Sequence, residues 1–150
     1  MSVIIFSWSG PVGIIVIWDD DEKTRLRHLY SGHVDSGELF AAIEVSTLFL
    51  DCVYYPVNLI VDMQGDLDSS GMISPISSLR IRAHPNLNRV VFVGKSQYTK
   101  KMRGVFQKLQ RRMGDKVAFV ATLAEARALL NVSHERTTAS HNIFPDIVAV

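Results

Sequence analysis

Carboxylates and hydroxyls gather directly after an apolar segment in the middle of the chain. The segment VNLIVDMQ (57–64) is typical of a buried strand, and GDLDSSGMIS (65–74) follows it. Serines placed there can lie at the start of a helix, where unpaired N–H groups and the positive end of the helix dipole suit a phosphate. An ordinary polar turn into the next helix explains the same residues, so both interpretations stay open. The residues in question are Asp62, Asp66, Asp68, Ser69, Ser70 and Gly71.

Two groups of acidic residues suggest a phosphoaspartate site of the receiver-domain kind, in which carboxylates bind Mg²⁺. They are IWDDDE (17–22) and Asp62, near the end of the apolar segment. The residues that such a site needs later in the chain are missing. VVFVG ends in Gly94 instead of a hydroxyl residue, and no lysine follows VAFV (117–120). The sequence therefore predicts no metal site.

The chain also lacks the usual catalytic motifs. It has no glycine-rich phosphate loop, no nucleophile elbow and no cluster of histidine and cysteine. Ser70 could form a dyad with His28, His33 or His84, but no pattern brings them together. The single cysteine, Cys52, lies in LFLDCVYY and is expected to be a small buried apolar residue. We therefore expect neither an enzyme nor a cofactor.

Composition places the chain among soluble globular proteins. Its 150 residues are 47% hydrophobic and 21% charged, which suits one domain with a sizeable core. The apolar start (1–18) has no basic region, and Gly10 and Pro11 interrupt it, so we expect two short strands rather than a membrane span. In the absence of other targeting signals, the expected location is the cytoplasm.

Hydrophobic periodicity predicts an α/β fold, with a mixed, partly parallel sheet of about five strands and about four helices. Asp35 and Thr122 are the expected N-caps of two helices, and each has a glutamate three residues later. His28 alternates with apolar residues and is expected to be packed or at the rim of the core. The expected strands are 13–18, 24–32, 56–63, 88–94 and 116–120, and the expected helices are 34–51, 75–84, 96–113 and 122–130.

The expected helix 34–51 has more apolar surface than one face needs. Leu39, Ile43 and Leu50 follow helical spacing toward the core. The apolar tail NIFPDIVAV (142–150) is one possible cover for the surplus residues, and a dimer or ligand surface is the other. The surplus residues are Val45, Leu48 and Phe49.

Charge is distributed unevenly along the chain, although the formal net charge is only +1. There are 11 acidic and 3 basic residues up to Asp68, whereas 80–116 holds 11 basic residues and one acidic residue. The basic face of the expected helix 96–113 is either an ordinary solvated face or a surface for anionic lipid or for the acidic face of a second copy. Nucleic acid is not expected, because few aromatic residues lie among the bases. The basic face consists of Lys100, Lys101, Arg103, Lys108, Arg111 and Arg112.

Four segments in this order resemble the STAS-like domains, which are relatives of the bacterial anti-sigma factor antagonists and are sometimes grouped with the lipid-binding CRAL-TRIO domains. They are IWDDDEKTRLRHLYSG, PVNLIVDM, HPNLNRVVFVGKS and VAFVATLAEARALL. We expect one STAS-like domain over 1–131, with an extra N-terminal strand in 1–12 and a polar, then apolar, tail over 132–150. The resemblance implies a small mixed sheet with helices mainly on one side.

The same resemblance gives the DSSG sequence (68–71) a regulatory role. It implies that Ser70, or its neighbour Ser69, is phosphorylated by a partner kinase and that the phosphate switches partner binding. Pro75 departs from the family pattern, because a helix that began at Ser70 would carry a proline beyond its first turn, at a cost of about 3 kcal/mol. A helix capped by Ser74 would hold Pro75 at its first position, where proline is favourable.

These patterns predict a non-enzymatic protein-interaction or regulatory module, with anti-sigma factor antagonist-type switching as one form of it. The expected partner is a kinase-like anti-sigma factor or a second copy of the chain. The alternative is a small carrier for a lipid or another apolar ligand, suggested by the surplus apolar face beside a basic helix.

Overall fold

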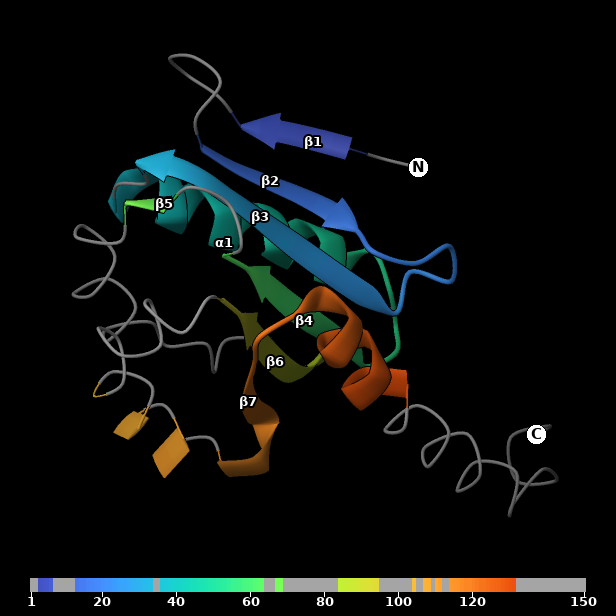
Figure 1. Ribbon diagram of the computed structural model, residues 1–150. Helices are drawn as coiled ribbons and strands as arrows, with labels where there is room; N and C mark the ends of the chain where they lie inside the picture. The colour runs from blue at the N-terminus through green and yellow to red at the C-terminus, as the bar shows by residue number, and fades with distance from the viewer. Residues whose placement is uncertain are drawn as a thin grey trace, which may run out of the picture.

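A twisted β-sheet forms the centre of the protein, and the described helices pack against its two faces (Figure 1). The computed structural model describes residues 3–6, 13–33, 36–63, 67–68, 84–94, 104, 107–108, 110–111 and 114–131.

Six strands lie side by side in chain order. They are β1 (Val3–Phe6), β2 (Gly13–Trp18), β3 (Arg25–His33), β4 (Val57–Asp62), β6 (Leu87–Val93) and β7 (Val117–Val120), and the two-residue β5 (Leu67–Asp68) pairs with the end of β3. The β1–β2 and β2–β3 pairs are antiparallel, whereas β3–β4, β4–β6 and β6–β7 are parallel. The expected mixed sheet is therefore confirmed, with β1 added to its five main strands.

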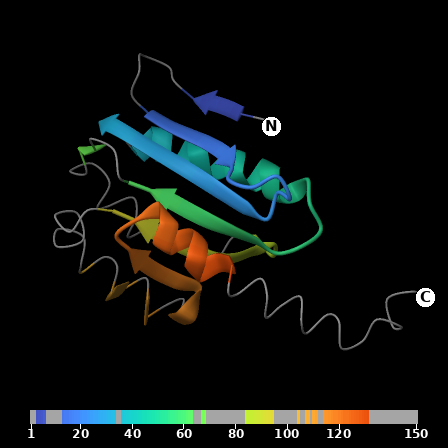
Figure 2. The same cartoon turned by 45° about the vertical axis from the view of Figure 1, so that its right-hand side comes forward.

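The helices of the described part are fewer than the sequence suggested. Within the described residues the full helices are α1 (Ser36–Asp51) and 123–131, instead of about four. The expected helix 75–84 lies almost entirely outside the described residues, and only five residues of 96–113 are described, all helical. α1 and 123–131 pack on opposite faces of the sheet (Figures 1 and 2).

β4 lies in the middle of the sheet and is buried along its whole length. Alternate side chains of a strand point to opposite faces. Leu59 and Val61 accordingly join the core beneath α1, whereas Ile60 joins a smaller core beneath 123–131. Covering both faces explains why this segment is continuously apolar instead of alternating.

The buried face of α1 is wider than the stripe that the sequence suggested. Leu50 is buried as expected, Ile43 is partly buried against the core, and the side chain of Leu39 lies outside the described residues. Ala42, Val45, Ser46 and Phe49 are all buried, at the spacing of one helix face. Val45 and Phe49 are therefore core residues and not an apolar interaction face, and the Phe49 ring meets Trp18 edge-on at 5.4 Å between centroids. Because Ser46 is polar and Ala42 is small, hydrophobic periodicity alone does not reveal this buried face. Only Leu48 of the three surplus residues is exposed.

Side-chain hydrogen bonds hold the ends of the two helices. Asn86 Nδ2 donates to the carbonyl oxygens of Leu50 at 3.1 Å and Val53 at 2.9 Å, which supplies partners for the open end of α1. At the start of 123–131, the Glu125 N–H donates to Thr122 Oγ1 at 3.2 Å, and the Glu125 carboxylate accepts from the Ala121 N–H. The predicted cap by Thr122 and Glu125 is confirmed.

Candidate functional site

A chain of hydrogen bonds crosses the core between β3 and α1. Ser46 Oγ donates to the Ala42 carbonyl at 2.8 Å, so its only proton is used there. His28 Nε2, 2.5 Å from Ser46 Oγ, must then be the donor in that contact. His28 Nδ1 is consequently unprotonated and accepts from the Tyr30 hydroxyl at 3.0 Å. His28 was expected to be packed or at the rim, and it is packed.

Burial controls the ionisation of His28 and Tyr30, the two titratable side chains in this row of hydrogen bonds. Desolvation lowers the pKa of His28 to about 4 and raises the pKa of Tyr30, because each charged form would lie in the apolar core. His28 is therefore neutral at physiological pH, with both ring nitrogens occupied. It cannot act as a general base toward a bound substrate, which excludes it from the dyad that we considered with Ser70.

His84 is occupied in a similar way at the end of α1. Its Nδ1 accepts from the Asn86 N–H at 3.1 Å, and its Nε2 donates to Asp51 Oδ1 at 2.6 Å. The imidazole thus joins the start of the β6 segment to the last residue of α1. Neither nitrogen is available for catalysis in this arrangement. The side chain of His33 lies outside the described residues.

Asp19 is the centre of an ionic cluster on the other face of the sheet. Its fully buried carboxylate lies 3.2 Å from Arg25 Nε, 3.0 Å from Arg27 Nη1 and 2.7 Å from Arg127 Nη2. Burial alone would raise the pKa of Asp19, but hydrogen bonds and charge from Arg127, then from Arg27, outweigh it and hold the pKa below its usual value. The cluster fixes 123–131 to the end of the β2–β3 hairpin.

Asp62 does not belong to an open loop. It is the last residue of β4, only 6% exposed, and its Oδ2 lies 3.8 Å from Arg27 Nε. Asp62 was expected both to lie in the strand 56–63 and to begin the switch loop; it is the last residue of β4, and its side chain is buried beside Arg27.

The remaining switch-loop residues are described only at one position. Asp68 lies in β5 and pairs with His33, close to the start of α1 at Ser36. The other switch-loop residues lie outside the described residues; they are Asp66, Ser69, Ser70 and Gly71. The segment in which a helix was expected to begin, at Ser70 or at Ser74, lies outside them as well.

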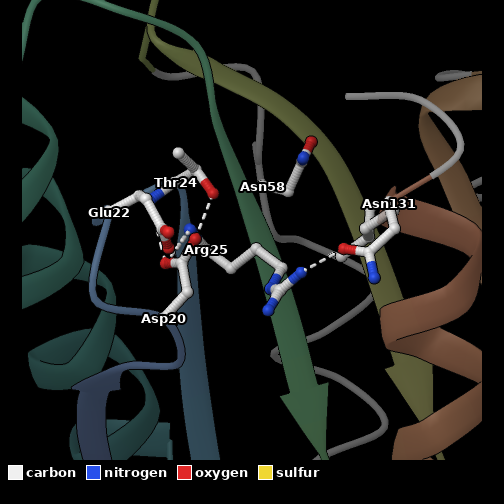
Figure 3. A pocket seen from close by; sticks show the side chains of 7 residues that line it. Asp20, Glu22, Thr24, Arg25, Asn58 and Asn131 are labelled. Atoms are coloured by element: carbon white, nitrogen blue, oxygen red, sulfur yellow. Dashed lines mark hydrogen bonds between the residues drawn. The ribbon is translucent and has the colours of Figure 1, made fainter. Parts of the chain in front are cut away.

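A small polar cleft opens between the hairpin turn and the end of 123–131, with a volume of about 230 Å³. Figure 3 shows Arg25 reaching across β4, where its Nη1 donates to Asn131 Oδ1 at 2.6 Å. The cleft is lined by Asp20, Glu22, Thr24, Arg25, Asn58, Leu130 and Asn131.

Most polar groups of this cleft bind one another. Asp20 Oδ1 accepts from the N–H groups of Thr24 and Arg25, both at 2.9 Å, and Asp20 Oδ2 accepts from the Thr24 hydroxyl. Asp20 therefore closes the turn, in which Lys23 has a φ of 59°. Asp20, one acid of the receiver-type site that the sequence analysis set aside, thus has a structural role. No group of three metal-binding side chains occurs among the described residues.

A different surface lies at the C-terminal end of α1, and we call it the acidic end. The Tyr55 hydroxyl donates to the Glu22 carbonyl at 3.2 Å and so brings the hairpin turn beside the segment that follows α1. Two large apolar side chains are exposed there, Leu48 at 61% and Tyr54 at 93%. The exposed carboxylates of the acidic end are Asp21, Glu22, Glu44 and Asp51.

The basic face is described at two of its six residues. Lys108 and Arg111 are exposed and lie on helical backbone, whereas Lys100, Lys101, Arg103 and Arg112 lie outside the described residues. Cys52 was expected to be buried, but it is exposed just after α1, because the helix ends before the chain turns back into β4.

The sequence patterns missed the two buried polar groups. Asp19 was grouped with its acidic neighbours, and no prediction was made for Ser46. The alternation of Leu26, His28 and Tyr30 was the available signal for the core chain, since a histidine on an apolar strand face needs polar partners.

Comparison with protein-family models, with curated proteins and with solved structures gives no match to this chain. None of the helices in the described part of the chain is long and apolar enough to span a membrane.

Proposed function

We propose that the chain is a non-enzymatic STAS-like module that regulates another protein by binding to it. The order of elements supports this proposal, because an antiparallel hairpin leads into three strands that run parallel to β3. A small mixed sheet of this kind is what the STAS-like resemblance implies.

The exposure of Leu48 and Tyr54 is the observation that carries the proposal. Within the described residues these are the exposed large hydrophobic side chains, and both lie at the acidic end. Apolar anchors with charged residues around them are typical of protein-binding surfaces, where the apolar centre supplies affinity and the charged rim selects the partner. The acidic rim favours a partner with a basic surface.

Phosphorylation of Ser70 is the proposed regulatory step, with Ser69 as the alternative acceptor. Support comes from β5, because Asp68 of the DSSG sequence is held beside the end of β3 and near the start of α1. A phosphate added next to Asp68 adds a charge of about −2 at the place where β5, the end of β3 and the start of α1 meet.

Incubation with a cognate kinase extract, followed by mass spectrometry, tests the regulatory step. We expect a phosphate on Ser70 or Ser69 and none on Ser140, which lies in the C-terminal tail. Ser70→Asp should weaken binding of the partner captured by the unmodified protein, and Ser140→Asp should leave it unchanged. If both serines stay unmodified and Ser70→Asp binds normally, the switch is refuted.

Double substitution at the acidic end tests the binding function separately. Leu48→Ser/Tyr54→Ser should abolish partner binding while the far-ultraviolet circular dichroism spectrum stays the same, since both side chains are exposed. Ala128→Ser, at an exposed position of the helix 123–131 on the opposite face of the sheet, is the control. Unchanged partner binding by the double variant would remove the acidic end from the proposal.

Native mass spectrometry of freshly purified protein addresses the carrier alternative. Val45 and Phe49 pack in the core, so only Leu48 is left of the surface that suggested an apolar ligand. The proposed module predicts masses of the bare chain or its multimers, whereas a co-purifying acyl chain would favour the carrier.

A further inference from the structure

We infer that the acidic end of one copy binds the basic face of a second copy, so that the protein assembles head to tail. The inference rests on the proposed function, because it names one partner for the surface around Leu48 and Tyr54. The partner is a second copy of this chain, recognised by opposite charge.

The acidic end has the composition of one half of such an interface. Glu44, Leu48 and Asp51 follow each other at intervals of four and three residues, so they form one stripe on the outer side of α1. Asp21 and Glu22 are exposed in the hairpin turn, which the Tyr55 hydroxyl holds beside the segment that follows α1. Lys23 is the exposed basic residue among these carboxylates, so negative charge predominates.

The basic face supplies the complementary half. Lys108 and Arg111 are three residues apart on helical backbone, and Gln107 and Gln110 beside them are also exposed. Lys116 is exposed a few residues further on, in the 3₁₀ turn η2 (Gly114–Lys116). The whole segment 80–116 holds 11 basic residues and one acidic residue, so the partner charge is present in excess.

The positions of the two surfaces require a second copy. Figures 1 and 2 both show the hairpin turn and the C-terminal end of α1 on one side of the molecule and the helical pieces between 104 and 111 on the opposite side. One chain therefore cannot bring its own two surfaces together. Contacts between unlike surfaces do not close into a two-fold dimer; they add copies into a ring or an open row. A net charge of +1 leaves little overall repulsion between copies.

Two charge-reversal variants of the full chain test this arrangement. Glu22→Lys/Glu44→Lys reverses the acidic end, and Lys108→Glu/Arg111→Glu reverses the basic face. Glu135→Lys/Asp146→Lys in the C-terminal tail is the control, because it changes the net charge as much as the first variant does. Analytical ultracentrifugation at low and high salt gives the mass of each protein alone and in mixtures.

We expect the wild-type protein and the control to form multimers at low salt that dissociate at high salt, since the Debye length falls from about 30 Å at 0.01 M to about 3 Å at 1 M salt. Each reversed variant should associate at least about tenfold more weakly than the wild type. A mixture of the two variants should associate again, because the intact acidic end of one variant meets the intact basic face of the other, and the two reversed surfaces also carry opposite charges.

Three results would overturn the inference: a wild-type protein that stays monomeric at low salt, variants that associate like the wild type, or variants that do not pair when mixed. Binding of the captured partner is measured in parallel. A monomeric protein that still binds that partner through Leu48 and Tyr54 would refute self-assembly and leave the proposed function standing.

Discussion

His28 Nε2 and Ser46 Oγ lie 2.5 Å apart and join β3 to α1 through the core. Both side chains are buried, and each has a further partner, Tyr30 for the imidazole and the Ala42 carbonyl for the hydroxyl. Apolar packing holds α1 against the sheet, but it is not directional. The hydrogen bond is directional, so it also fixes where α1 lies along the sheet.

Removing the Ser46 hydroxyl should leave the His28 N–H without a partner in the core. We expect Ser46→Ala to lower the free energy of unfolding by about 1–3 kcal/mol, the cost of an unsatisfied buried donor. Thr47→Ala is the matched control, because Thr47 Oγ1 donates to the Ile43 carbonyl at 3.0 Å in a less buried position. Urea unfolding curves compare the two variants, and equal losses would contradict the importance of the buried chain.

Acid should destabilise the protein through His28. The folded-state pKa is about 4 and the ordinary value is 6.5, so the unfolded chain binds more protons between these two pH values. The free energy of unfolding should fall by about 3 kcal/mol as the pH falls from 7 to 4. Unfolding curves across this range measure it, and His28→Leu should flatten the slope.

Asp19 should be far more important for stability than the neighbouring acids. Asp19→Asn would leave three arginines without their shared carboxylate, and we expect a loss of about 2–3 kcal/mol, reduced by the remaining exposure of the guanidinium groups to water. Asp21→Asn, at an exposed position of the same turn, should change stability by less than about 0.5 kcal/mol. Thermal unfolding checks both variants, and similar melting temperatures for the two would contradict a stabilising role of the Asp19 cluster.

Two glycines should respond in opposite ways to alanine. An added Cβ meets nothing within 4 Å at Gly104 or at Gly114, so only the backbone matters. Gly104 is helical, and Gly104→Ala should stabilise the protein by up to about 1 kcal/mol. Gly114 has a φ of 57°, so Gly114→Ala should destabilise it by about 1 kcal/mol. Urea unfolding of both variants tests the signs, and a gain at Gly114 would contradict the left-handed turn.

Local patterns were sufficient for much of the fold. The alternation of Leu26, His28 and Tyr30, the continuous apolar run of β4 and the cap at Thr122 each depend on a few neighbouring residues, and all three are present in the structure. The antiparallel and parallel strand pairings follow from the order of such elements.

The candidate site depended on partners far apart in the sequence, which local patterns do not contain. Ser46 looks like a surface residue of α1 until His28, 18 residues earlier, is placed against it. Asp19 looks like one acid of a run until Arg127 reaches it from 108 residues away. In both cases a polar residue is buried because a distant partner satisfies it, and only the assembled sheet provides that partner.

The contact between Asp19 and Arg127 also bears on how the chain folds during synthesis. The β2–β3 hairpin is made early, but its buried carboxylate obtains the Arg127 partner only after nearly all of the chain to 131 has left the ribosome. Contacts of such long sequence separation close late. The β2–β3 hairpin is therefore completed by the helix 123–131, so a chain that stops before Arg127 keeps an incompletely paired buried charge and is a substrate for chaperones or proteases.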